Sequence, residues 1–134
     1  NKDTNMIGIW ADYHTTYLLT LGTITTLFFG LPLTFAPLHW ARLMLWKLPQ
    51  ETDLALYFGR CVGVFVLIVE YFIFQSGVNG THLAFTFELL NLVFTLMALL
   101  HIYGAIKRIQ PITETLEIGL WFGLLALNLA CTPL

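Results

Sequence analysis

Charged residues are scarce in this sequence. Among 134 residues there are only 6 Lys or Arg and 8 Asp or Glu, so 10% of the chain is charged while 57% is hydrophobic. The mean hydropathy is +0.77. A soluble domain of this size needs a far more polar surface, so the composition excludes one and indicates an integral membrane protein. The formal net charge of −2 also leaves no basic surface on which nucleic acid could bind.

Cysteine is scarce as well, since Cys61 and Cys131 are the only two in the sequence. Both lie inside apolar runs, where a cysteine usually behaves as a small buried hydrophobic residue. We therefore expect neither a disulfide nor a cysteine-ligated metal ion from this pair.

Long apolar runs are what the chain has in abundance. A helix rises about 1.5 Å per residue, so about 20 apolar residues cross the ~30 Å hydrocarbon core of a bilayer. Four runs reach this length and predict transmembrane helices over residues 15–36, 54–75, 82–106 and 113–130. The predicted fold is all-α: one membrane domain over residues 1–134, built as a bundle of four transmembrane helices.

A fifth segment, residues 39–49, is too short and too charged to cross the membrane. It places Trp40 and Trp46 beside Arg42 and Lys47. Aromatic rings at the headgroups with basic residues in water are typical of an amphipathic segment that lies in the membrane interface. We expect such a segment directly after the first helix.

The distribution of basic residues predicts the topology. The connections after the first and third helices contain Arg42, Lys47, Lys107 and Arg108, whereas the opposite side has Lys2 alone. Lys and Arg accumulate on the cytoplasmic side of membrane proteins. A multi-pass protein with both termini on the non-cytoplasmic side is therefore predicted.

The helix predicted over residues 54–75 carries two full charges, Arg60 and Glu70. An ionisable side chain inside the hydrocarbon is costly unless it faces protein, water or a partner. Both residues fall on one arc of the helical wheel, and the other helices carry comparable polar stripes. One shared interior would satisfy these groups. The predicted intramembrane polar network comprises Arg60, Glu70, Glu88, Asn91, Glu117 and Asn128.

Depth along the helices suggests partners within this network. Arg60 and Glu117 lie toward the charged-loop side of their helices, so an ion pair between them is geometrically reasonable. Glu70 and Glu88 lie toward the opposite side, before and after the second connection. We expect these two carboxyl groups to be neighbours at similar depth.

The histidines offer further interpretations. With Glu70 and Glu88, His14 and His82 could form a metal or proton site, since carboxylate and imidazole suit Fe, Cu, Mn or Zn. The alternative is that the carboxyl groups hold the helices together by hydrogen bonds, and the Glu-x-x-His pair of di-iron bundles is absent. Haem ligation by His14, His82 or His101 is a third interpretation. His82 and His101 are about 28 Å apart along one helix, so they could not bind the same haem.

Several features of the sequence occur together in one arrangement. The first helix ends in a Gly/Pro-containing segment, the second begins with Arg-x-x-Gly, and a histidine near the end of the third precedes a basic-Pro turn. The residues concerned are Gly30-Leu31-Pro32, Ala36-Pro37, Arg60-Cys61-Val62-Gly63, His101 and Gly104. In this arrangement the chain resembles the DoxX-like group of small four-helix membrane proteins. The resemblance implies a four-helix fold and a role in either quinone-dependent oxidation or assembly, because members are linked to both.

The sequence favours a structural or accessory subunit of a larger membrane complex, of the respiratory or photosynthetic electron-transport kind. Its loops are short, and phenylalanines such as Phe28, Phe65 and Phe85 give aromatic faces that could bind lipid, pigment or another transmembrane subunit. No catalytic residues are predicted, and an enzymatic activity of its own is not expected. Two alternatives stay open. One is a quinone- or metal-binding redox protein that handles protons through Glu70, Glu88 and the histidines, and the other is a small transporter lined by the polar stripes.

Overall fold

A computed structural model describes residues 6–133 as an all-helical chain without strands in that range. Four stretches are long and apolar enough to cross a membrane. They are Ala11–Phe35, α4 (Asp53–Asn79), α5 (Leu83–Lys107) and α6 (Ile112–Cys131), and the short helix α3 (Pro37–Leu43) follows the first of them. The predicted fold class, a membrane bundle of four transmembrane helices, is confirmed.

The first span is divided near Pro32. It consists of a 3-10 turn (Ala11–Tyr13), α1 (His14–Thr25), a π-helical turn (Thr26–Gly30) and α2 (Leu31–Phe35). Proline has no N–H, so the carbonyl of Phe28 loses its helical donor. The indole Nε1 of Trp40, in α3, donates to that carbonyl over 2.9 Å. The first helix, predicted over residues 15–36, is therefore a span kinked near Pro32, as a proline there leads one to expect, and α3 holds its end.

The end of α4 differs from the prediction, since the helix continues to Asn79 and not only to residue 75. It stops at Gly80, which has φ 68 and donates its backbone N–H to the Ser76 carbonyl. Glycine adopts this left-handed conformation without a steric penalty, which makes it a common helix terminator. The helix thus runs through polar residues that the hydropathy pattern assigned to the loop.

The segment predicted to lie in the interface is only partly helical. α3 ends at Leu43, and Leu45 has a positive φ of 65. From there the chain runs without helix to Thr52. The predicted amphipathic segment is therefore a short helix followed by a loop, and this loop contacts α6 as described below.

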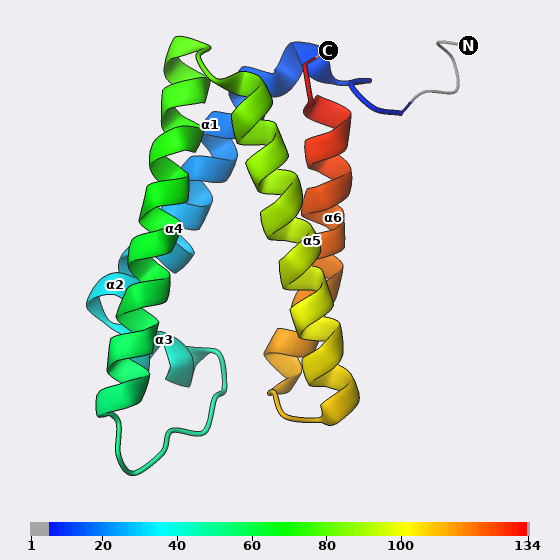
Figure 1. The fold of residues 1–134 in the computed structure, drawn as a ribbon. Helices are drawn as coiled ribbons and strands as arrows, with labels where there is room; N and C mark the ends of the chain where they lie inside the picture. The colour runs from blue at the N-terminus through cyan, green and yellow to red at the C-terminus, as the bar shows by residue number, and fades with distance from the viewer. Residues whose placement is uncertain (1–5, 134) are drawn as a thin grey trace.

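The helices form two pairs (Figure 1). α1 and α2 pack along α4, and α5 packs along α6, whereas α4 and α5 diverge from the turn that joins them. The first pair approaches closely at a glycine, because a Cβ on Gly63 would lie 2.4 Å from the backbone nitrogen of Thr34. Small residues allow membrane helices to pack at such short distance. The bundle is thus two tight pairs with a looser seam between them.

Polar side chains join the two pairs at this seam. The Tyr17 hydroxyl donates to Asn128 Oδ1 over 2.6 Å, and Asn128 Nδ2 donates to Asn91 Oδ1 and to the Phe87 carbonyl over 2.7 and 3.0 Å. Asn128 is completely buried. The hydrophobic core around this network comprises Tyr17, Leu18, Leu21, Ile73, Phe87, Leu90, Phe94, Ala98, Trp121 and Cys131. Of the predicted network, Asn91 and Asn128 therefore lie together.

Candidate functional site

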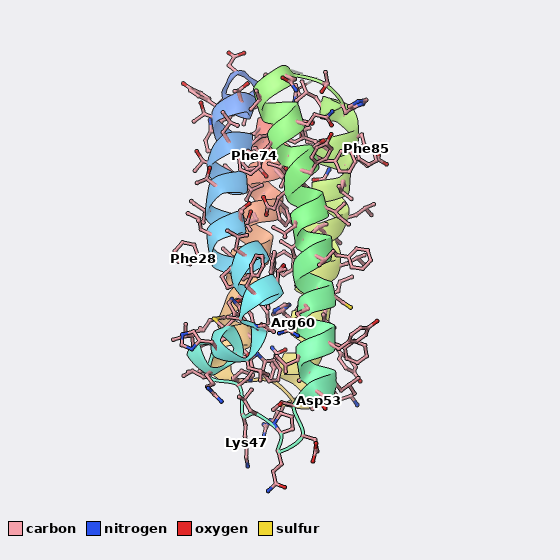
Figure 2. All side chains as sticks on the ribbon, turned by 90° about the vertical axis from the view of Figure 1, so that its left-hand side faces the viewer. Phe28, Lys47, Asp53, Arg60, Phe74 and Phe85 are labelled. Carbon is pink, nitrogen blue, oxygen red and sulfur yellow. The ribbon has the colours of Figure 1, made fainter. Side chains whose placement is uncertain are left out.

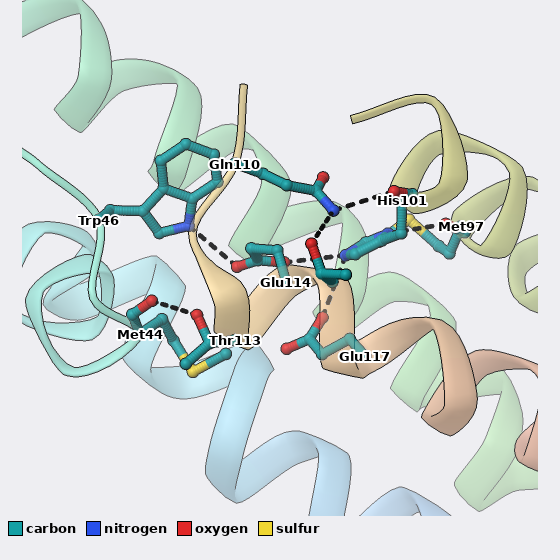
Figure 3. A network of polar contacts seen from close by, with 9 residues as sticks. Met44, Trp46, Met97, His101, Gln110, Thr113, Glu114 and Glu117 are labelled. Atoms are coloured by element: carbon teal, nitrogen blue, oxygen red, sulfur yellow. Dashed lines mark hydrogen bonds and ion pairs between the residues drawn. The ribbon is translucent and has the colours of Figure 1, made fainter. Parts of the chain in front are cut away.

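A cluster of one imidazole and two carboxyl groups lies between α5 and α6 (Figure 3). His101 Nε2 lies 2.8 Å from Glu114 Oε2 and 3.1 Å from Glu117 Oε2. The three residues are buried, with exposed fractions of 6%, 7% and 9%. Ionisable groups at such burial in a membrane helix need one another or a ligand, and they mark functional sites more often than other positions do.

The ring of His101 is fixed by its own helix. Its Nδ1 lies 2.7 Å from the backbone carbonyl of Met97, one turn earlier in α5. A carbonyl oxygen can only accept, so Nδ1 carries the hydrogen and Nε2 is directed at the two carboxyl groups. The ring of Trp121 lies beside it, with centroids 5.8 Å apart.

The two glutamates are placed by the periodicity of α6. Glu114 and Glu117 are three residues apart and therefore face the same side of the helix. Glu114 lies in the first turn, where the helix dipole favours a negative charge. Both carboxyl groups are thereby directed at α5.

The loop after α3 completes the surroundings of Glu114. Trp46 Nε1 donates to Glu114 Oε1 over 2.9 Å, and the Thr113 hydroxyl donates to the Met44 carbonyl (Figure 3). This loop belongs to the first helix pair and α6 to the second. The cluster is therefore held from three sides, by α5, by α6 and by the loop over residues 44–52.

The turn between α5 and α6 is fixed by Gln110. Its Nε2 donates to the His101 carbonyl over 2.9 Å and to the Thr115 hydroxyl over 3.1 Å. The side chain lies against Gly104, where an added Cβ would be 1.9 Å from Gln110 Oε1. Gly104 is therefore required for the Gln110 side chain to reach across and hold His101 in place.

A groove of about 1000 Å³ runs along the seam between the two helix pairs. Its walls come from α1, the π-helical turn, α2, α3 and α6, and they are almost entirely apolar. Representative lining residues are Tyr13, Thr20, Phe28, His39, Leu124 and Cys131. Phe28 is 65% exposed and points outward in Figure 2, so the groove opens at the side of the molecule.

The groove and the cluster meet at Glu117. Glu117 and Trp121 line the groove, and Glu117 also contacts His101. Among the described lining residues there is no Lys, Arg or Asp, and Glu117 is the single carboxyl group. A long apolar surface therefore ends on one acidic side chain that belongs to a buried hydrogen-bonded cluster.

The predicted ion pair between Arg60 and Glu117 is wrong. Arg60 is exposed on α4 (Figure 2), and Glu117 is engaged by His101. The physical reason is that α4 packs on α1 and α2, while Glu117 belongs to the other helix pair. A long Arg side chain near a helix end can also reach the interface by itself.

The predicted neighbours Glu70 and Glu88 are also apart. Glu70 is buried, and the Thr25 hydroxyl of α1 lies 2.5 Å from its Oε1. Glu88 is exposed on α5. The hairpin opens away from its turn, so similar depth does not bring the two carboxyl groups together.

Two of the three candidate histidines stand apart from any cluster in residues 6–133. His14 Nδ1 lies 2.8 Å from the Ala11 carbonyl, a local contact, and His82 is exposed with φ 55 directly before α5. Only His101 joins other potential ligands. Glu114 was not among the predicted site residues, although its i, i+3 spacing to Glu117 could have indicated it.

No protein-family model, no curated protein and no solved structure matches this chain.

Proposed function

We propose that the protein is an intramembrane binding protein for a neutral amphiphile of the quinone class. The apolar tail occupies the groove along α1 and α6, and the head group lies at Glu117. The observation that carries this proposal is the meeting of an apolar groove of about 1000 Å³ with the carboxyl group of the buried cluster. Small-molecule sites in proteins combine apolar walls with a few fixed polar groups in this manner.

The chemistry of the lining favours a neutral head group. A phospholipid carries a phosphate, which Lys or Arg would normally pair with. The described lining of the groove has neither, and its one carboxyl group would repel an anion. A quinone or quinol exchanges hydrogen bonds with a carboxyl group as an uncharged acceptor or donor, so it suits Glu117.

The hydrogen-bonded chain behind Glu117 supports the same class of ligand. Glu117, His101 and Glu114 are linked through His101 Nε2, and Glu114 is bonded to Trp46 in the loop. Groups of this type can accept and return protons. Quinones and quinols differ by protons as well as electrons, so this ligand would make use of the chain. The DoxX-like resemblance adds support, since some members of that group are linked to quinone-dependent oxidation.

The second candidate function is an accessory subunit of a respiratory or photosynthetic complex. One observation favours it: the seam is open at the side, with Leu27 58% and Phe28 65% exposed. A transmembrane helix of a neighbouring subunit could complete such a seam. In that case a protein, and not a quinone, would occupy the groove.

Quenching of tryptophan fluorescence by a decyl-substituted benzoquinone tests the proposal. Trp40 and Trp121 line the groove, so a bound quinone ring would quench them in a saturable way. Thr20→Phe places a ring in the groove and should weaken the apparent affinity at least about tenfold, or ~1.4 kcal/mol. Glu117→Gln should weaken it too, whereas the matched variant Glu88→Gln, at an exposed carboxyl group, should not.

Two outcomes would contradict the proposal. One is quenching that rises linearly with the quinone-to-detergent ratio and is the same in Thr20→Phe. The other is a groove already occupied by a co-purifying subunit, which would favour the accessory role.

A further inference from the structure

We propose that His101, Glu114 and Glu117 form a binding site for a divalent metal ion of the Mn(II), Fe(II) or Zn(II) class. The site lies beside the groove and does not depend on what the groove contains. His101 comes from α5 and the two glutamates from α6, and each offers one ligand atom toward a common centre.

The orientation of the His101 imidazole suits a metal ligand. Its Nδ1 donates to the Met97 carbonyl, so Nε2 faces the centre of the cluster and, when it carries no proton, directs its lone pair there. Metal-binding histidines almost always donate their other ring N–H to a carbonyl or carboxylate in this way. A lone pair directed at two carboxyl oxygens also requires a positive centre between them, either a proton or a metal ion.

The distances suit a metal ion. Metal bonds of about 2.1 Å at right angles place neighbouring ligand atoms about 3.0 Å apart. His101 Nε2 lies 2.8 and 3.1 Å from the two carboxyl oxygens, and the three ligand atoms are all within 4.8 Å of one another. The three ligand atoms are therefore close enough for small side-chain movements to bring them onto one ion.

The charges point to a divalent ion as well. When both are ionised, Glu114 and Glu117 bring two negative charges into a buried site, and within residues 6–133 no Lys or Arg pairs with either. A buried charge without compensation is strongly unfavourable. One divalent cation compensates both carboxylates at once, whereas protons must occupy two separate positions to do the same.

The ligand set indicates the class of metal. One imidazole nitrogen with two carboxylate oxygens suits Mn, Fe or Zn, while Cu(I) prefers sulfur. Cys131 belongs to the opposite end of α6 and contributes nothing here. Three protein ligands leave at least one coordination position open, and Glu117 is the ligand that also lines the groove.

The groups around the ligands resemble an outer shell that orients them. Trp46 donates to Glu114 Oε1 and thereby leaves Oε2 toward the centre. Outer-shell partners of this kind typically contribute about 10- to 100-fold to metal affinity. In a cluster of acidic side chains that binds no metal ion, Trp46 would have no metal affinity to influence.

The test uses the full chain in mild detergent after treatment with a chelator. Mn²⁺ binding is followed by electron paramagnetic resonance and Zn²⁺ content by plasma mass spectrometry. We expect one ion per chain in the wild type and loss of it in the double variant Glu114→Gln/Glu117→Gln. Glu88→Gln should retain it, and Trp46→Phe should bind about 10- to 100-fold more weakly.

Binding that is no stronger in the wild type than in the double variant would overturn the proposal, and protons would then hold the cluster together. If the double variant does not fold, the wild type decides the question by itself. A saturable rise in Tm with Mn²⁺ or Zn²⁺ beyond that with Mg²⁺ supports the site, and its absence overturns it. Quinone quenching is measured separately, so the two proposals can fail independently.

Discussion

Gly104 is the smallest residue of the site and one of its most constrained. A Cβ there would lie 1.9 Å from Gln110 Oε1, so Gly104→Ala must displace Gln110 from the His101 carbonyl and Thr115. Loss of these bonds should lower the free energy of unfolding by about 1–3 kcal/mol, measured by thermal or denaturant unfolding in detergent. Gly119→Ala, with open space around it, is the control and should be neutral or stabilising by up to about 1 kcal/mol. Equal effects of the two variants would contradict this role.

Asn128 is one of the residues that join the two helix pairs. Asn128→Leu removes the partners of the Tyr17 hydroxyl and of Asn91 Oδ1 in a buried seam. Each polar group left without a partner costs about 1–3 kcal/mol, so we expect a clear loss of stability in the same unfolding assay. Tyr17→Phe removes only one bond and should cost less. A larger effect of Tyr17→Phe than of Asn128→Leu would argue against Asn128 as the centre of the seam.

The residues of the site were only partly predictable from the sequence. Glu117 and His101 were recognised because an ionisable side chain within an apolar run is conspicuous. Their partnership was not, because a helical wheel shows which residues share a face but not which helix lies against it. Arg60 illustrates this: it shares an arc with Gly63, yet Gly63 is buried and Arg60 is exposed.

The packing of α2 on α4 depends on Gly63. The nearest atom to an added Cβ is the backbone nitrogen of Thr34, at 2.4 Å, and backbone cannot move aside without moving α2. Gly63→Ala should therefore destabilise the protein by about 1–3 kcal/mol through overpacking, again measured by unfolding in detergent. Gly123→Ala in α6, which has open space, serves as the matched control. An unchanged stability in Gly63→Ala would show that the first helix pair packs less tightly than described.

The helices themselves were predictable because their length and hydropathy are set by the membrane. The break in the first span follows from Pro32, but the donor that replaces its missing N–H, Trp40, comes from another helix. The pairing of α1 and α2 with α4, and of α5 with α6, depends on tertiary contacts such as those at Gly63. Sequence periodicity carries no information about such contacts. The sequence therefore predicted one shared interior for all four helices, whereas the structure has two helix pairs with a groove between them.

The whole molecule has its basic loops at one end. The α3–α4 loop and the α5–α6 turn lie at the same end in Figure 1, opposite the start of α1 and the end of α6. Since these connections contain Arg42, Lys47, Lys107 and Arg108, we expect that end to face the cytoplasm. Single cysteines introduced by Gln50→Cys and Asn79→Cys, in a background without the two native cysteines, report the sidedness by labelling with an impermeant maleimide. We expect position 79 to be labelled from outside. Labelling of position 50 from outside would show that the topology is the reverse of the predicted one.

The groove and the cluster are connected through Glu117. The groove is open to the membrane at its side, and Glu117 connects it to His101, Glu114 and the loop that contains Trp46. A ligand entering from the lipid would thus meet a polar chain that leads toward the basic end of the molecule.

Photo-crosslinking from inside the groove tests this account most directly. With p-benzoylphenylalanine in place of Phe29, a half-buried aromatic side chain that already lines the groove, irradiation of membranes that contain the protein, followed by mass spectrometry of the intact chain, identifies what occupies the groove. We expect an adduct with the mass of a quinone, displaced by added decyl-substituted benzoquinone. A crosslink to another protein subunit, or to phospholipid alone, would contradict it.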